Sequence, residues 1–114
     1  MYEKSLTVDK EKSNMVDKLK GNDADELFKA ILQLKTVDEC YALFEDLCTI
    51  KELQSMTQRF VVAKMLREKC VYSDIVEQTG ASTATISRVN RSLLYGRDGY
   101  ELVLERLKNE EKQG

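Results

Sequence analysis

The chain has 114 residues, of which 42% are hydrophobic and 33% are charged, and its formal net charge is −2. This length suits one compact domain, and the apolar content excludes an intrinsically disordered chain. The lack of histidine removes the usual general base near neutral pH, which argues against an enzyme. With no proline and only five glycines, the sequence favours long helices, so the expected fold class is all-α.

The cysteines and the apolar runs exclude two further classes of site. Cys40, Cys48 and Cys70 form no CxxC pair and have no histidine beside them, so we expect no metal site. Three thiols without a signal peptide are typical of a reducing cytoplasm. No apolar run approaches the roughly 18 residues of a membrane span. We therefore expect a cytoplasmic protein with no membrane segment and no required cofactor.

The N-terminal third divides into a charged arm and a first helix. Residues 1–20 alternate lysine with acidic residues, which predicts a solvated arm or a marginal helix before a single domain over 21–114. Asn22 or Asp23 is expected to cap a helix whose apolar residues recur at spacings of three and four. This buried stripe consists of Leu27, Phe28, Ile31, Leu32 and Leu34.

Two capping boxes predict the next two helices. In Thr36-Val-Asp-Glu39 and Thr49-Ile-Lys-Glu52, the threonine hydroxyl and the glutamate carboxylate satisfy free N–H groups at a helix start. The inner face of the first helix is expected to carry Cys40, Leu43, Phe44 and Leu47. The second is a longer amphipathic helix with Leu53, Met56, Phe60, Ala63, Leu66 and Cys70 on its inner face.

The pattern after Val71 predicts a helix-turn-helix over about residues 73–95. Ser73 is expected to cap a short helix over 74–79 that stops at Gly80, because glycine adopts the left-handed conformation needed for a sharp turn. Ile75 is expected to pack the first helix against the second. The inner face of the second helix carries Ala81, Ile86, Val89 and Leu93. Asp98, between Gly96 and Gly99, then caps a last helix with Leu102, Leu104 and Leu107.

Charge is segregated along the chain. Residues 21–58 carry eight acids and three lysines, whereas residues 82–97 carry three arginines and no acid. A polyanion would therefore dock on the second half. A solvated helical face produces the same pattern, and so does a helical interaction module that binds a basic partner through its acidic half.

The second helix of the motif suits the major groove of double-stranded DNA. Small side chains at its start allow close approach to the bases, and arginines pair with guanine or phosphate. Cations on the preceding helix would hold the flanking backbone. The predicted DNA-binding residues are Ser82, Thr83, Ala84, Thr85, Ser87, Arg88 and Arg91, supported by Lys64, Arg67 and Lys69.

The stretch Gly80-Ala-Ser-Thr-Ala-Thr-Ile-Ser-Arg88, continuing through Asn90-Arg-Ser-Leu93, resembles the Trp repressor family. Residues upstream of this stretch also match the family pattern, so the resemblance covers about residues 22–107. The resemblance is closest to the YerC/YecD branch of Gram-positive bacteria. It implies a homodimer of interlocked N-terminal helices that represses transcription on a palindromic operator.

The same resemblance implies a small-molecule effector site. In the family an amino-acid corepressor lies between two arginines, which correspond to Arg59 and Arg88, with Thr49 and Ser92 near its polar end. Guanidinium planes stack on an indole and also bind a carboxylate. The family has glycine where this chain has Val89, whose branched side chain would fill the slot for the ring. This departure argues against tryptophan as the effector.

Overall fold

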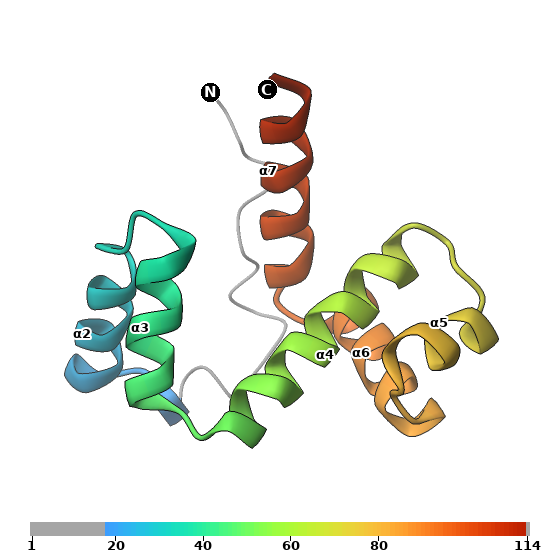
Figure 1. Ribbon diagram of the computed structural model, residues 1–114, viewed down its shortest axis with the longest axis horizontal. Helices are drawn as coiled ribbons and strands as arrows, with labels where there is room; N and C mark the ends of the chain where they lie inside the picture. The colour runs from blue at the N-terminus through green and yellow to red at the C-terminus, as the bar shows by residue number, and fades with distance from the viewer. Residues whose placement is uncertain (1–17, 114) are drawn as a thin grey trace. The chain divides into compact units, whose positions relative to one another are not determined.

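The computed structural model describes residues 18–113, so residues 1–17 of the predicted arm lie outside the described residues. Within that range the chain forms helices and no strand, which confirms the all-α fold (Figure 1). The helices are α2 (Asn22–Ile31), α3 (Val37–Leu47), α4 (Ile50–Arg67), α5 (Tyr72–Thr79), α6 (Thr83–Tyr95) and α7 (Gly99–Gln113).

The described residues fall into two compact units, and the boundary between them lies within α4. The N-terminal unit runs to Met56 and contains α2, α3 and the start of α4. The C-terminal unit runs from Thr57 and contains the rest of α4 with α5, α6 and α7. The single domain over residues 21–114 stays a prediction, because compactness does not establish which part of a chain folds independently.

Both capping boxes of the N-terminal unit form hydrogen bonds. The Thr49 hydroxyl accepts from the Glu52 N–H at 3.0 Å, and the Glu52 carboxylate accepts from the Thr49 N–H at 2.8 Å. Thr36 caps α3 in the same way at 3.1 Å, but Glu39 accepts from the N–H of Lys35 instead. The cap predicted for α2 is wrong, since α2 starts at Asn22 behind Gly21 with no side-chain cap.

The predicted stripe of α2 is not buried, since Leu27, Phe28 and Leu32 are exposed and Ile31 and Leu34 are only half-buried. Neither α2 nor α3 has a buried residue, and Phe28 and Leu32 are 59% and 79% exposed. Leu32 and Leu34 follow α2, because the helix ends at Ile31. The helical periodicity is therefore present, but the chain by itself does not cover the apolar face.

The hydrophobic core lies in the C-terminal unit, where α4, α5 and α6 meet. It confirms the burial predicted for Ala63, Ile75 and the inner residues of α6. Val62 and Met65 of α4 are also buried and were not among the predicted inner-face residues, whereas the predicted Leu66 and Cys70 are half-buried and pack against the core. The core consists of Val62, Ala63, Met65, Ile75, Ala81, Ile86 and Val89, with Leu66, Cys70, Leu93 and Tyr100 packed against it.

The connection between α4 and α5 differs from the prediction at both ends. The helix α4 stops at Arg67 rather than continuing through Cys70, because Lys69 is left-handed with φ 69° and the Cys70 N–H returns to the Met65 carbonyl at 3.0 Å. The helix α5 begins at Tyr72 behind Val71, so the predicted Ser73 cap is wrong.

Candidate nucleic-acid interface

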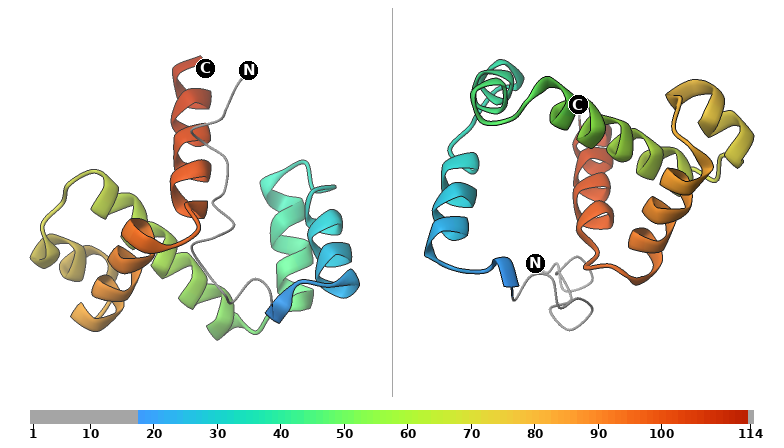
Figure 2. Two further views of the ribbon diagram at one scale, coloured as in Figure 1. Left: turned by 180° about the vertical axis from the view of Figure 1, so that it is seen from behind. Right: turned by 90° about the horizontal axis from the view of Figure 1, so that it is seen from below.

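The two helices of the predicted motif, α5 and α6, join at a tight turn (Figure 2). Gly80 is left-handed with φ 71°, and its N–H donates to the Val76 carbonyl at 2.9 Å, which closes α5. Ser82 then caps α6 by accepting from the Thr85 N–H at 3.1 Å. Only three residues therefore separate α5 from α6, which is the connectivity of a helix-turn-helix.

The inner face of α6 is held by the core. Ile86 is fully buried and Val89 is 2% exposed, and both pack in the cluster that contains Ile75 of α5 and Val62 of α4. Interiors are close-packed, so rotation of α6 about its axis would open voids or cause clashes. The buried face therefore determines which side chains of α6 point to solvent.

The outer face of α6 carries the side chains predicted to contact DNA. Thr83, Ser87 and Arg91 recur every four residues, so they lie along one side of the helix, with Ala84 and Arg88 on the adjacent row. All five are exposed. The row extends over about 12 Å of the helix, from eight rises of about 1.5 Å. A helix with its side chains is about 10–12 Å across, so α6 fits the major groove, which is about 12 Å wide.

Among the predicted contacts, Ser82 and Thr85 also have a local role. Ser82 is exposed, whereas Thr85 is half-buried. The two hydroxyls lie 3.1 Å apart and form a hydrogen bond, and the Ser82 hydroxyl also accepts from the Thr85 backbone. Both residues therefore stabilise the start of α6, where the helix approaches the bases most closely in this type of motif.

The electrostatics of α6 favour an anion. Its first turn has no acidic side chain, and no acid occurs between Ser82 and Arg97. The positive end of the helix dipole lies at that first turn, and Arg88 and Arg91 add two positive charges on exposed surface. Phosphate and the acceptor-rich edge of guanine suit such a face.

One supporting cation, Arg67, is engaged by α7. Its Nε lies 2.5 Å from Glu101 Oε1, and its terminal nitrogen pairs with the Glu105 carboxylate. Hydrogen bonding to Glu105 raises the pKa of Arg67, and the same bond lowers the pKa of Glu105. Periodicity within one helix gave no signal for these contacts, which join residues 34 and 38 positions apart.

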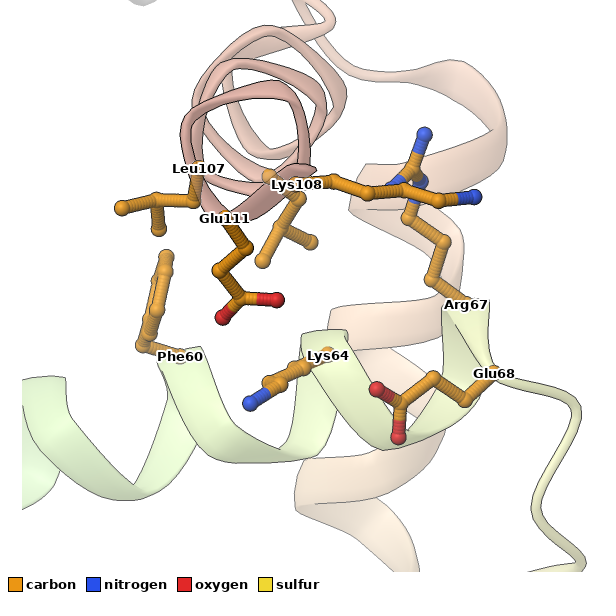
Figure 3. A pocket seen from close by; sticks show the side chains of 8 residues that line it. Phe60, Lys64, Arg67, Glu68, Leu107, Lys108 and Glu111 are labelled. Atoms are coloured by element: carbon orange, nitrogen blue, oxygen red, sulfur yellow. The ribbon is translucent and has the colours of Figure 1, made fainter. Parts of the chain in front are cut away.

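Lys64 and Arg67 line a groove of about 540 Å³ between α4 and α7. In Figure 3, Phe60 points from α4 toward Leu107 of α7, and Glu111 reaches from α7 toward Lys64. Leu104, Lys108 and Glu68 complete the lining. Lys69 lies beyond the end of α4 and is exposed. Phosphate contacts by these three cations stay predictions.

The predicted effector residues do not share one unit. Thr49 belongs to the N-terminal unit, whereas Arg59, Arg88 and Ser92 belong to the C-terminal unit. Arg59 is half-buried, and Arg88 and Ser92 are exposed. Val89, the departure from the family pattern, lies in the core.

Two kinds of feature are absent from residues 18–113. No helix in that range is long and apolar enough to cross a membrane. No group of three or more cysteine, aspartate or glutamate side chains there is arranged to hold a metal ion.

Comparison with known proteins gives consistent matches. The Trp repressor protein family model matches residues 22–108. The uncharacterized protein YerC of Bacillus subtilis (strain 168) is 56% identical over 91 residues, covering 80% of this chain and 88% of YerC. The crystal structure of a TrpR-like protein from Eubacterium eligens ATCC 27750 is 64% identical with a TM-score of 0.79, covering 81% of this chain and 95% of that one.

A second crystal structure, of a Staphylococcus aureus protein, is 51% identical with a TM-score of 0.81 and covers 84% of this chain and 96% of its own. The fold and the matches define a helix-turn-helix regulator, a class that binds DNA and is not enzymatic. The chain belongs to the Trp repressor family. This confirms the resemblance inferred from the Gly80–Leu93 stretch.

Proposed function

We propose that this protein is a homodimeric repressor that occupies a palindromic operator, with one α6 in each of two successive major grooves. The observation that carries the proposal is the outer face of α6, which is exposed, free of acids and bears Arg88 and Arg91. Double-stranded DNA is the partner, and the cytoplasm is the compartment where we expect the protein to act.

The exposed apolar surface of α2 and α3 supports a dimer. Phe28, Tyr41 and Leu47 are 59%, 64% and 50% exposed, and neither helix buries a residue within its own chain. Large exposed apolar patches on a stable protein mark interfaces. A two-fold dimer covers the same patch on both copies, and it presents two recognition helices.

The groove between α4 and α7 offers a receiving surface for such a partner. Phe60, Leu104 and Leu107 form its apolar part, and its rim carries cations together with the acids Glu68 and Glu111. The exposed apolar side chains of a partner's α2, Phe28 among them, are therefore complementary to the groove in hydrophobicity.

We also propose that operator binding requires no corepressor. Val89 is 2% exposed inside the core, so the space beside α6 is filled by the chain's own side chain. Effector binding through Thr49, Arg59, Arg88 and Ser92 is the alternative. Isothermal calorimetry with millimolar L-tryptophan tests it: measurable heat of binding would contradict the corepressor-free proposal while leaving DNA binding intact.

The experiment that tests the function is selection of bound fragments from random duplex DNA by the full chain. We expect recovered sites to contain two inverted half-sites about 10 base pairs apart, one helical turn of DNA. Binding should weaken steeply with salt, because each neutralised phosphate releases counterions. Recovery of no preferred sequence would overturn the proposal.

A second candidate is a protein interaction module that never binds DNA. The acidic character of residues 21–58, together with the exposed faces of α2 and α3, favours it. Under this alternative, neutralising Asp23 and Asp25 removes partner binding, and substitutions on α6 have no effect.

A further inference from the structure

A chain of hydrogen bonds joins α4 to the turn that precedes α6. The Gln58 side-chain amide of α4 donates from Nε2 to the Thr79 carbonyl oxygen at 3.0 Å. The Thr79 hydroxyl donates to the Ile75 carbonyl at 2.7 Å and accepts from the Ala81 N–H at 3.1 Å. Residues 21 positions apart are thereby linked at the corner of the helix-turn-helix.

The acceptor of the Gln58 bond is a backbone group that α5 leaves unpaired. Thr79 is the last residue of α5, and the last four carbonyls of a helix have no partner within it. Gln58 and Thr79 are both half-buried, so water has limited access to this carbonyl. A carbonyl only accepts, so the glutamine must present its NH₂ group here, which settles the orientation of the amide.

The bonded turn sets the direction in which α6 leaves α5. Thr79, Gly80 and Ala81 are adjacent, Ala81 is 1% exposed in the core, and Ser82 follows as the N-cap of α6. The core fixes the rotation of α6 about its axis, whereas these bonds fix the backbone of the corner. A small tilt at this corner moves the far end of the exposed row, where Arg91 lies.

We propose that Gln58, a residue on a different helix and outside the outer face of α6, is a positioning residue for specific DNA recognition. It acts through Thr79 and the turn, and it contacts neither base nor phosphate. This inference rests on the proposed function, and it deepens that function by adding a specificity determinant that is remote from the interface.

The test compares specific with non-specific DNA affinity. Gln58→Met keeps the length and volume of the side chain but removes the donor. We expect operator affinity to fall about 5- to 150-fold, the effect of one lost hydrogen bond in each protomer of the dimer. Affinity for unrelated duplex and the slope of affinity against salt should not change, because no phosphate contact is lost. Gln54→Met, on an exposed position of the same helix, is the matched control.

A double-mutant cycle measures the ratio of specific to non-specific affinity, which a purely structural role of Gln58 would leave unchanged. Thr79→Val keeps the shape of the side chain and removes its hydroxyl. If both residues act through one turn, Gln58→Met and Thr79→Val lower the ratio of specific to non-specific affinity by less than the sum of their single effects. Should Gln58→Met melt below the assay temperature, Gln58→Asn replaces it, since it keeps the amide but is one methylene too short.

Two outcomes overturn the inference. One is operator affinity within twofold of wild type for Gln58→Met. The other is an equal loss of specific and non-specific affinity. The rate of amide hydrogen exchange at Ala81 tests the inference on the free protein, without DNA. We expect this exchange to be faster in Gln58→Met than in wild type. Failure of the wild-type chain to prefer any duplex sequence would instead refute the proposed function, so the two failures are distinguishable.

Discussion

Arg91→Ala separates DNA recognition from folding most directly. Arg91 is exposed on α6, eight residues after Thr83 on the same row. Surface substitutions of this kind change the free energy of unfolding by less than about 0.5 kcal/mol. The midpoint of thermal unfolding, followed by circular dichroism, should therefore stay within about 2–4 °C of wild type.

The loss of DNA affinity should be large by comparison. A good contact between an arginine and a base contributes about 1–3 kcal/mol of discrimination. A dimer presents two copies of Arg91, so the operator complex should lose about 2–6 kcal/mol, a drop in affinity of about 30-fold or more. Fluorescence anisotropy on a labelled operator duplex measures it.

The same assay distinguishes a base contact from a phosphate contact. If Arg91 reads a base, the variant tolerates changes at one position of each half-site. If Arg91 binds phosphate, affinity falls equally for all sequences and the salt slope decreases by about one for each arginine removed. Arg106→Ala, an exposed arginine on α7, controls for net charge. Unchanged operator affinity in Arg91→Ala would refute the assignment of α6 as the recognition helix.

Three further substitutions test the core, the turn before α6 and the ion pair between α4 and α7. Ile86→Asp places a charge at a fully buried position, so we expect loss of cooperative thermal unfolding of the C-terminal unit by circular dichroism, and a retained wild-type midpoint would contradict the core assignment. Gly80→Ala should cost about 1–2 kcal/mol in chemical denaturation, because its φ of 71° is unfavourable with a Cβ even though no atom lies within 4 Å. Arg67 lowers the pKa of Glu105, so that pair stabilises the fold fully above the carboxyl's ordinary pKa of 4.5 and loses its effect as pH falls through the lowered value. Glu105→Gln should therefore flatten the acid limb of a stability-against-pH curve, and an identical limb in both proteins would exclude the pair as its cause.

Local sequence signals predicted the corner of the motif well. Gly80 acts through its own backbone, so residue type alone is informative about the turn, whereas the capping role of Ser82 was not predicted. The Thr49–Glu52 box and the Thr36 cap succeeded for the same reason, whereas Glu39 accepts from the Lys35 N–H and leaves the first box half formed. The prediction that Ser73 caps α5 failed because a serine near a helix start is compatible with several starting residues. The short α5 has too little periodicity to choose among them.

Long-range contacts could not be predicted in this way. The choice of Val62 and Met65 as buried residues depends on which side of α4 faces α5 and α6, and α4 is apolar on more than one side. Gln58 and the carboxylates around Arg67 lie on helices that are distant in sequence from their partners. Such pairs have no short-range signature, so only the packed structure shows them.

The division of α6 into two faces has a consequence for how recognition can change within this fold. Its buried residues pack in the core with residues of α4 and α5 and cannot vary without opening a cavity, whereas Thr83, Ser87 and Arg91 are exposed. Exchanging the exposed row should therefore alter the preferred operator at nearly constant stability.

The corner held by Gln58 and Thr79 belongs to neither face of α6. It is bonded to the core residue Ala81, and it determines the direction in which the exposed row points. Substitutions there should change affinity for every operator that a given row can read, rather than exchange one operator for another.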